Sequence, residues 1–228
     1  MKLEFLLEIG CEEIPSSFLH PMSLSLKQGI TDLIRENSIS LESSQHYFSP
    51  RRLIIHLTGV EEKQATRREI ITGPPYKIAF DEKGNPSQAT KGFARKNNIP
   101  IGDLSNINID KGSYIGFKKE IVGQKTKLIL LEKLPEVISR LELPKGMTWD
   151  SSGFIFVRPI RWILCLLGGE VLPIKVAGLK ASCYTFGHRI LRQNKKKTVN
   201  SFSNYNKWLR SNLVQINPEI RKESLEKQ

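Results

Sequence analysis

Hydrophobic and polar residues alternate at the start of the chain and then change to a helical spacing. From Lys2 to Ile9 apolar side chains occupy every second position, which predicts a half-buried strand. Gly10 to Pro15 is predicted to form a turn. From Phe18 onward apolar residues recur every three or four positions, which predicts a helix that ends at Asn37.

The same two patterns predict further elements. Strands are expected at residues 53–60, 107–110, 113–122, 154–157, 161–167 and 171–176, with 182–190 as a further candidate. Helices are expected at 87–97, at 125–141 and from Phe202 to Leu213, and Pro135 should kink or divide the second of these. Residues 219–228 are charged with almost no apolar anchor, so they predict a helix cut short or a frayed end.

Strands and helices mix without strict alternation, which favours an α+β fold with mixed or antiparallel sheets and packed helices. We place one domain at residues 1–200 and predict that residues 201–228 begin a helical linker. In the strand at 161–167, Trp162 shares one face with Leu164 and Leu166, whereas Arg161 falls on the other. We therefore predict that Trp162 is core and that Arg158 and Arg161 lie at the surface.

The net charge of the chain indicates what kind of partner it binds. The formal net charge is +12, although the 39% of hydrophobic and 25% of charged residues are ordinary for a globular protein. Such a surplus favours a polyanionic partner, and nucleic acids are the obvious class. The plainer alternative is a generally basic surface.

Cysteine usage and the N-terminus indicate the compartment. Cys11, Cys165 and Cys183 are far apart and odd in number, which argues against a disulfide framework and fits a reducing cytoplasm. The apolar run at the start is broken by Glu4 and Glu8, so it does not resemble a signal peptide. The longest apolar stretch, residues 162–169, is too short to cross a bilayer, so we expect no membrane association.

The patterns of self-contained active sites are missing from the sequence. There is no phosphate-binding loop, no dinucleotide fingerprint and no nucleophile elbow. The four histidines are scattered, which argues against a metal site. Glu12 and Glu13 are expected to act structurally, as carboxylates near a helix N-terminus. We thus predict no catalytic residues, no metal and no cofactor in this chain.

Eight basic side chains are candidates for binding nucleic acid or a partner subunit: Arg51, Arg52, Arg158, Arg161, Arg189, Lys195, Lys196 and Lys197. Arg51 and Arg52 enter a strand, where phosphate binding and a plain arrangement of one inward ion pair and one solvated Arg are equally supported. Arg158 and Arg161 precede Trp162, and packing on this ring is favoured over stacking on a base.

The remaining candidates lie near the C-terminal end. Arg189 follows His188, which is expected to be a satisfied, partly buried histidine. Residues 195–197 are predicted to form a flexible basic loop that attracts phosphates without specificity, or that is merely solvated.

Several short strings occur in a distinctive order: EIGCEEIP at residues 8–15, SPRRL at 49–53, GNPSQA at 84–89, GFA at 92–94, MTW at 147–149, FVRPIRW at 156–162 and GHR at 187–189. Together, in this order and at these separations, they resemble the N-terminal region of the beta subunit of the heterotetrameric bacterial glycyl-tRNA synthetase. The resemblance covers nearly the whole chain. One departure is Thr148, where the family usually carries an arginine.

The resemblance implies a fold like the editing-type domain of the phenylalanyl-tRNA synthetase beta subunit. It also implies a beta subunit that binds tRNA-Gly and assembles with a catalytic alpha subunit into a tetramer of two alpha and two beta chains. In the family, the alpha subunit holds the class II active site and uses ATP and magnesium. The family's beta subunit is several times longer and has an HD-like and an anticodon-binding domain, so the chain is expected to be a fragment or a truncated gene product.

Our reading is a tRNA-binding and assembly region without chemistry of its own. The alternatives are a stand-alone hydrolase that edits aminoacyl-tRNA in trans, or an inactive truncated subunit. Editing is needed where a pocket cannot reject a smaller or isosteric rival. Glycine is the smallest amino acid and has no smaller rival, so a proofreading role has no clear reason.

Overall fold

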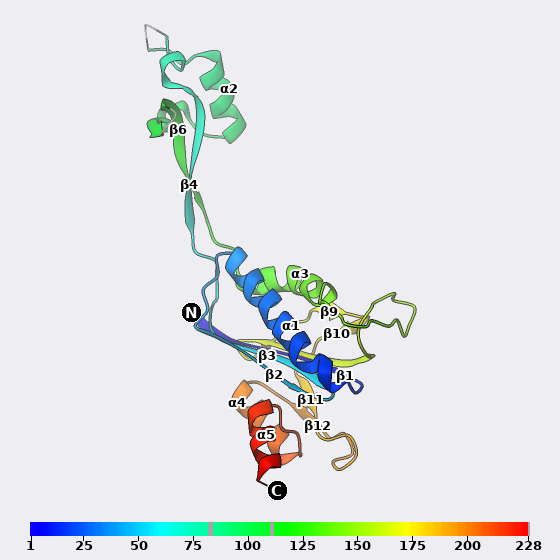
Figure 1. The fold of residues 1–228 in the computed structure, drawn as a ribbon. Coiled ribbons are helices and arrows are strands. Elements are labelled where there is room, and N and C mark those ends of the chain that lie inside the picture. The colour runs from blue at the N-terminus through cyan, green and yellow to red at the C-terminus, as the bar shows by residue number, and fades with distance from the viewer. Residues whose placement is uncertain (82–83, 110–111, 228) are drawn as a thin grey trace. The chain divides into compact units, whose positions relative to one another are not determined.

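The structure is a computed structural model, and it describes residues 1–81, 84–109 and 112–227. The chain forms two compact units (Figure 1). Unit 1 comprises Met1–Gln64 and Gln124–Gln228, and unit 2 comprises Ala65–Gly123. Unit 2 is therefore an insertion within the sequence of unit 1.

Unit 1 is built on a five-stranded antiparallel sheet in the order β2-β3-β1-β7-β8. Its strands are β1 (Lys2–Cys11), β2 (Ser43–Ser49), β3 (Arg52–Glu61), β7 (Ile160–Leu167) and β8 (Glu170–Val171). The strands predicted at 2–9, 53–60 and 161–167 are confirmed. β2 was missed because its half-polar sequence, SSQHYFS, lacks an apolar alternation.

Helices cover both faces of this sheet (Figure 1). One face carries α1 (Ser16–Glu36) and α3 (Thr126–Ser139), which pack on residues such as Leu7 and Ile163. The other carries α4 (Phe202–Ser211), whose Tyr205 and Leu209 pack on Leu6 and its neighbours. Because both faces are covered, β1 is buried through most of its length, not half-buried as its alternating pattern predicts.

The C-terminal residues differ from the predicted linker. α4 and α5 (Pro218–Glu226) belong to unit 1, so no boundary falls at residue 200. The reason is the second face of the sheet: Leu6, Ile54, Leu164 and Leu166 need a cover, and α4 supplies it. Trp162 is buried as predicted, and its pairing with Gly10 puts it on the side of Leu164, whereas Ile163 and Cys165 belong to the other core.

Several predicted elements of unit 1 need correction. Pro135 does not divide α3, which is continuous and buries Leu134 and Ile138 on the sheet side. Residues 154–157 are not a strand and hold only an isolated bridge between Met147 and Phe156. The remaining strands are short: β9 (Lys175–Val176), β10 (Leu179–Lys180), β11 (Tyr184–Phe186) and β12 (Lys196–Thr198). The strands predicted at 171–176 and 182–190 are therefore mostly irregular chain, and the apolar pattern cannot separate chain that fills the core from a strand.

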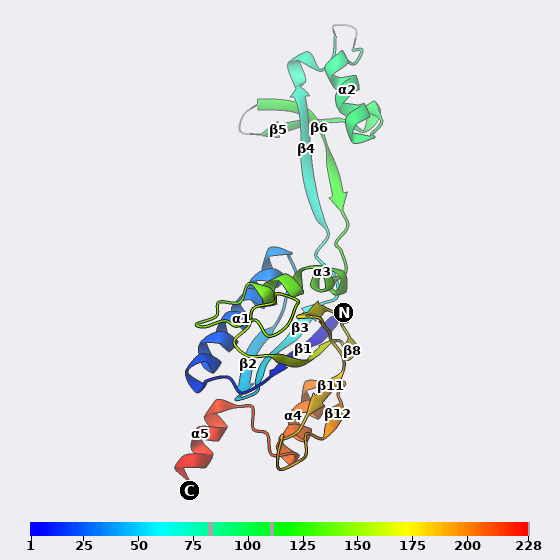
Figure 2. The same cartoon turned by 90° about the vertical axis from the view of Figure 1, so that its right-hand side faces the viewer.

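Unit 2 is a three-stranded antiparallel sheet with one α-helix on it (Figure 2). The order is β4-β6-β5, with β4 (Arg67–Pro75), β5 (Ser105–Ile109) and β6 (Gly112–Ile121). The strands predicted at 107–110 and 113–122 correspond to β5 and β6, and residues 110 and 111 between them lie outside the described residues. Two short 3₁₀ turns, η1 (Tyr76–Ile78) and η2 (Ile101–Asp103), flank α2 (Gln88–Asn97) in the sequence.

Helix α2 is present where the pattern of residues 87–97 predicts a helix, and both of its ends are capped. The Ser87 side chain accepts a hydrogen bond from the Thr90 backbone N–H, and Asn98 ends the helix in the left-handed conformation. Phe93 packs near Phe117 of β6, and a Cβ at Gly73 would lie 2.8 Å from the Phe93 ring. The helix therefore sits close on the sheet because residue 73 has no side chain. Both units combine helices with antiparallel sheets, whereas the likeness to the phenylalanyl-tRNA synthetase editing domain stays a prediction.

Candidate functional site

Four of the candidate arginines of unit 1 gather around two acidic residues. The Glu12 cluster consists of Glu12, Glu13, Arg51, Arg161 and Arg189. Arg161 Nε donates to Glu12 Oε1 at 2.7 Å, and Arg189 Nη1 donates to Glu12 Oε2 at 3.1 Å. Arg51 Nη2 lies 3.5 Å from the same Oε2. One carboxylate thus faces three guanidiniums that come from three different segments of the chain.

Glu13 adds a second carboxylate to the cluster, at longer distances from the arginines. Its Oε1 lies 3.6 Å from Arg189 Nη1 and 3.8 Å from Arg51 Nε. Arg158 touches the same corner through the backbone, since its Nε donates to the Glu13 carbonyl at 3.2 Å. Three arginines therefore contact two carboxylates, and Arg158 lies beside them, so the cluster keeps a positive surplus.

A β-bulge places Arg161 in the cluster. In the pairing of β1 with β7, Gly10 lies opposite Trp162 and Cys11 lies opposite Ile160, so Arg161 has no partner on β1. The bulge turns Arg161 toward the side of Trp162, and both residues line one cavity. The alternation predicted Arg161 on the opposite face, which is wrong for this physical reason. Its predicted place near solvent is confirmed, since its side chain is 56% exposed.

Backbone hydrogen bonds hold the β1 end against the β2–β3 turn. The Cys11 N–H donates to the Arg51 carbonyl at 3.0 Å, and the Ile14 N–H donates to the Pro50 carbonyl at 2.7 Å. The Arg51 side chain returns a bond from Nε to the Cys11 carbonyl at 3.1 Å. Glu12 and Glu13 are consequently set by these bonds and precede α1, whose first turn contains no acidic residue. Their predicted role at a helix N-terminus is wrong.

Arg52 is not available to a ligand. Its side chain is 4% exposed, and its Nε donates to Glu8 Oε1 at 2.8 Å. Its Nη2 donates to the carbonyls of Phe186 and Gly187. The arrangement of one inward ion pair is confirmed for Arg52, which is a structural residue, and its candidacy for RNA binding is wrong. Arg51 is also largely buried, not solvated.

Trp162 lies between the buried pair of Arg52 and Glu8 and the Glu12 cluster, and it contacts an arginine of each. The guanidinium of Arg52 lies 5.2 Å and that of Arg51 lies 5.7 Å from the Trp162 ring, within the range of a cation–π contact. The ring covers Gly10 so closely that a Cβ there would lie 1.9 Å from it. The predicted packing of Arg158 and Arg161 on this tryptophan is wrong, because Arg51 and Arg52 make the contact instead.

The charges of this region shift in directions that follow from these contacts. The hydrogen bond from Arg161 holds the pKa of the Glu12 carboxyl below its ordinary value of 4.5. Burial raises the pKa of Glu8 above that value, against the attraction of Arg52. Burial also raises the pKa of the Cys11 thiol to about 12 and raises that of Cys165. Both thiols are therefore unreactive near neutral pH.

Two cavities open on either side of Arg51 and Arg189. One of about 340 Å³ has apolar lining from Ile190, Leu213 and Val214, and Arg221 closes its edge. The other, of about 350 Å³, is lined by Glu12, Arg161, Trp162, Phe186 and Asn194 as well. Sequence reasoning missed Arg221, which donates to the Phe48 and Gln215 carbonyls at 2.7 Å each. It also missed Glu12 as the centre, because nothing in a single sequence shows which arginines converge on it.

The remaining predicted residues lie outside the cluster. Lys195, Lys196 and Lys197 are exposed, and the last two belong to β12, not to a loop. The Lys196 ammonium lies 3.6 Å from the centre of the Tyr184 ring. His188 is half-buried, and its Nδ1 accepts from the N–H groups of Ile190 and Leu191, so its satisfied state is confirmed.

The described residues hold no group of three or more His, Cys, Asp or Glu side chains that could bind a metal ion. Within residues 1–81, 84–109 and 112–227, no helix combines the length and apolarity needed to span a bilayer.

Comparison with known proteins decides the family. The family described as glycyl-tRNA synthetase beta subunit matches residues 5–228. The chain belongs to this family. A glycine–tRNA ligase beta subunit of Listeria monocytogenes serotype 4a (strain HCC23) is 37% identical over 228 residues, which is 100% of the chain and 33% of that protein. The resemblance seen in the ordered strings is thereby confirmed.

Two further members of the family agree. The glycine–tRNA ligase beta subunit of Lawsonia intracellularis (strain PHE/MN1-00) is 38% identical over 97% of the chain and 32% of its own length. That of Aquifex aeolicus (strain VF5) is 35% identical over 98% of the chain and 33% of its own length. The chain spans about a third of the length of these relatives and corresponds to the N-terminal part of a glycyl-tRNA synthetase beta subunit.

Proposed function

We propose that this chain contributes tRNA binding and subunit assembly to a glycine–tRNA ligase, in which a separate alpha subunit joins glycine to tRNA-Gly with ATP and magnesium. The chain carries out no chemical step itself. The observation that carries the proposal is the Glu12 cluster, where three arginines outnumber two carboxylates, together with Arg158 and the exposed lysines 195–197. A positive surplus next to open cavities suits phosphate oxygens or an acidic partner surface.

The exposure of each arginine side chain determines whether it can bind a ligand or only supports its neighbours. Arg161 and Arg189 are 56% and 53% exposed and each already donates to a carboxylate, so an incoming phosphate competes with Glu12 for them. Arg51 and Arg52 are held by Glu12, Glu8 and backbone carbonyls, and Arg51 shares the Glu12 carboxylate with the other two. Lysines 195–197 add a sequence-independent attraction.

The buried thiols of Cys11 and Cys165 do not favour a hydrolytic role, because a thiol with a raised pKa is a poor nucleophile. The chemistry of glycine agrees, since no smaller amino acid competes with it for a pocket. We therefore prefer a scaffold that holds tRNA and braces the alpha subunit to an enzyme that edits aminoacyl-tRNA in trans.

The proposal is tested by binding measurements on the pure chain. We expect weak, salt-sensitive binding of tRNA-Gly and of an unrelated tRNA alike, and no glycine-dependent ATP–pyrophosphate exchange by the chain alone. Replacing Arg161 and Arg189 by alanine should weaken tRNA or alpha-subunit binding in a titration and a pull-down. The matched control replaces Lys127 and Lys133 of α3, which also carry two exposed positive charges. Equal loss in both variants, or exchange activity of the pure chain, would contradict the proposal.

A further inference from the structure

Helix α2 of unit 2 carries basic side chains around a position that has none. Its inward side is formed by Thr90 and Ala94, which are buried. At 100° per residue the opposite side is centred on Gln88, Gly92 and Arg95, with Lys91 and Lys96 on its two flanks. All five are exposed, and the helix contains no acidic residue.

Nothing in the described fold requires a glycine at position 92. A Cβ built on it meets nothing within 4 Å, and its φ is not in the left-handed region. A glycine inside a helix lowers stability relative to alanine. At two other glycines of this unit, by contrast, a side chain would clash with its neighbours. At Gly73 a Cβ would lie 2.8 Å from the Phe93 ring, and at Gly116 it would lie 2.4 Å from the Ile71 carbonyl oxygen.

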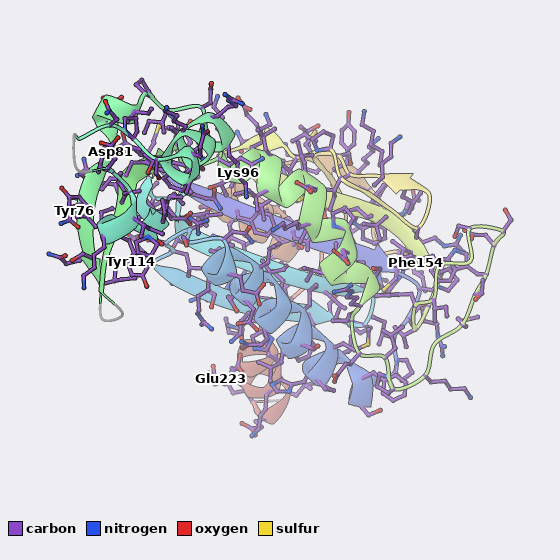
Figure 3. The ribbon with its side chains drawn as sticks, turned by 90° about the horizontal axis from the view of Figure 1, so that it is seen from above. Tyr76, Asp81, Lys96, Tyr114, Phe154 and Glu223 are labelled. Carbon is purple, nitrogen blue, oxygen red and sulfur yellow. The ribbon has the colours of Figure 1, made fainter. Side chains whose placement is uncertain are left out.

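The three cations beside Gly92 are free to bind an outside anion. No ion pair within the described part of the chain involves Lys91, Arg95 or Lys96. The position of Arg95 and Lys96 in the last turn is favourable for the helix dipole, which explains these two but neither Lys91 nor Gly92. In Figure 3, Lys96 lies on the opposite side of unit 2 from Tyr76.

We propose that the outer side of α2 binds the sugar–phosphate backbone of RNA, with a phosphate placed over Gly92 between Lys91, Arg95 and Lys96. The missing side chain lets a backbone approach the helix closely, and the three cations neutralise phosphates on either side of it. We prefer RNA to an acidic protein surface as the ligand. The phosphates of RNA repeat at even spacing and can follow α2, and they need no matching set of side chains on a partner. This inference rests on the proposed function, because it assigns a second contact for the same tRNA.

The charge arm of the test uses two triple variants with the same change of net charge. One replaces Lys91, Arg95 and Lys96 by glutamine, and the other replaces Lys77, Lys118 and Lys119, which are exposed in the same unit. Binding of a tRNA-Gly transcript is titrated from low to moderate salt. We expect the α2 variant to bind about ten- to a hundredfold more weakly near 0.1 M salt, with a salt slope lower by about 2 to 3, and the control to change little.

The steric arm uses Gly92→Gln with Gly102→Gln as its control, since a Cβ at Gly102 also meets nothing within 4 Å. Gly92→Gln should keep or raise the melting temperature by about 1–4 °C and yet weaken tRNA binding about fivefold or more. Gly102→Gln should bind as the unchanged chain does. A stabilised variant that binds less well cannot be explained by misfolding.

The outcomes separate the two claims. If the unchanged chain binds tRNA and both α2 variants bind it equally well, the inference about α2 is overturned while the proposed function stands. If the two triple variants lose the same affinity, the effect is one of net charge and the inference is also overturned. If the unchanged chain binds no tRNA at low salt, the RNA-binding part of the proposed function fails and the inference fails with it.

Discussion

Arg161 and Glu12 are hydrogen-bonded at 2.7 Å although 149 positions separate them in the chain. The bulge at the β1–β7 pairing makes this contact, since it removes Arg161 from the ladder and turns it to the side where β1 ends. Arg51 and Arg189 then complete the set of guanidiniums on the same carboxylate. The candidate site is therefore a product of strand register.

Glu12→Gln should lower the free energy of unfolding by about 1 kcal/mol at pH 7, because the partners are partly exposed. The pKa of Glu12 is depressed in the folded protein, so its contribution is present above the ordinary value of 4.5 and is lost as pH falls below it. Urea unfolding at pH 7 and pH 3 should show the difference at the higher pH alone. The same variant should bind tRNA more tightly, because it releases Arg161 and Arg189. Glu13→Gln, with longer contacts at 3.6 and 3.8 Å, is the control and should change less.

Arg52→Ala should lower the free energy of unfolding by about 3–5 kcal/mol, because it leaves the buried carboxylate of Glu8 without its positively charged partner. Burial raises the pKa of Glu8, so the folded variant takes up a proton more readily than the unfolded chain does. The loss should therefore be larger at pH 8 than at pH 5 in urea unfolding. Arg161→Ala is the matched control and should unfold almost as the unchanged chain does. A loss that is the same at both pH values would show that Glu8 is not the cause.

Trp162→Ala should cost about 3–5 kcal/mol, as expected for a buried aromatic residue. Gly10→Ala should also be destabilising, since its Cβ would lie 1.9 Å from the Trp162 ring. In the background of Trp162→Ala, however, Gly10→Ala should cost much less, because the ring that it strikes is gone. A double-mutant cycle by chemical denaturation measures this coupling. Additive losses would mean that the ring does not lie on Gly10.

Removing residues 65–123 and joining Gln64 to Gln124 should leave unit 1 folded. The two ends are already in contact, since the Gln64 N–H donates to the Gln124 carbonyl at 3.0 Å and the Gln124 N–H donates to Gln64 Oε1 at 3.0 Å. A connection between adjacent ends adds little loop entropy. Circular dichroism and a cooperative thermal transition should be retained by the shortened chain. A chain that loses its cooperative transition would show that unit 1 depends on unit 2.

The sequence by itself determined the elements whose pattern is strong and local. The alternation of β1, the helical period of α1 and the serine cap of α2 each follow from contacts within a few residues, and all three are present. It also determined the family, because the ordered strings are a property of the sequence alone. Charge indicated an anionic partner, since net charge is a sum that does not depend on the fold.

The tertiary structure alone decided which charged residues can meet a ligand. Arg51 and Arg52 are neighbours with the same side chain, yet Arg52 pairs with Glu8 in the core and Arg51 reaches Glu12. Glu8 occupies a polar position of an alternating strand, but α4 covers that face and buries it. Burial, strand register and the convergence of distant segments depend on long-range packing. The pattern of residue types along the chain contains no information about that packing.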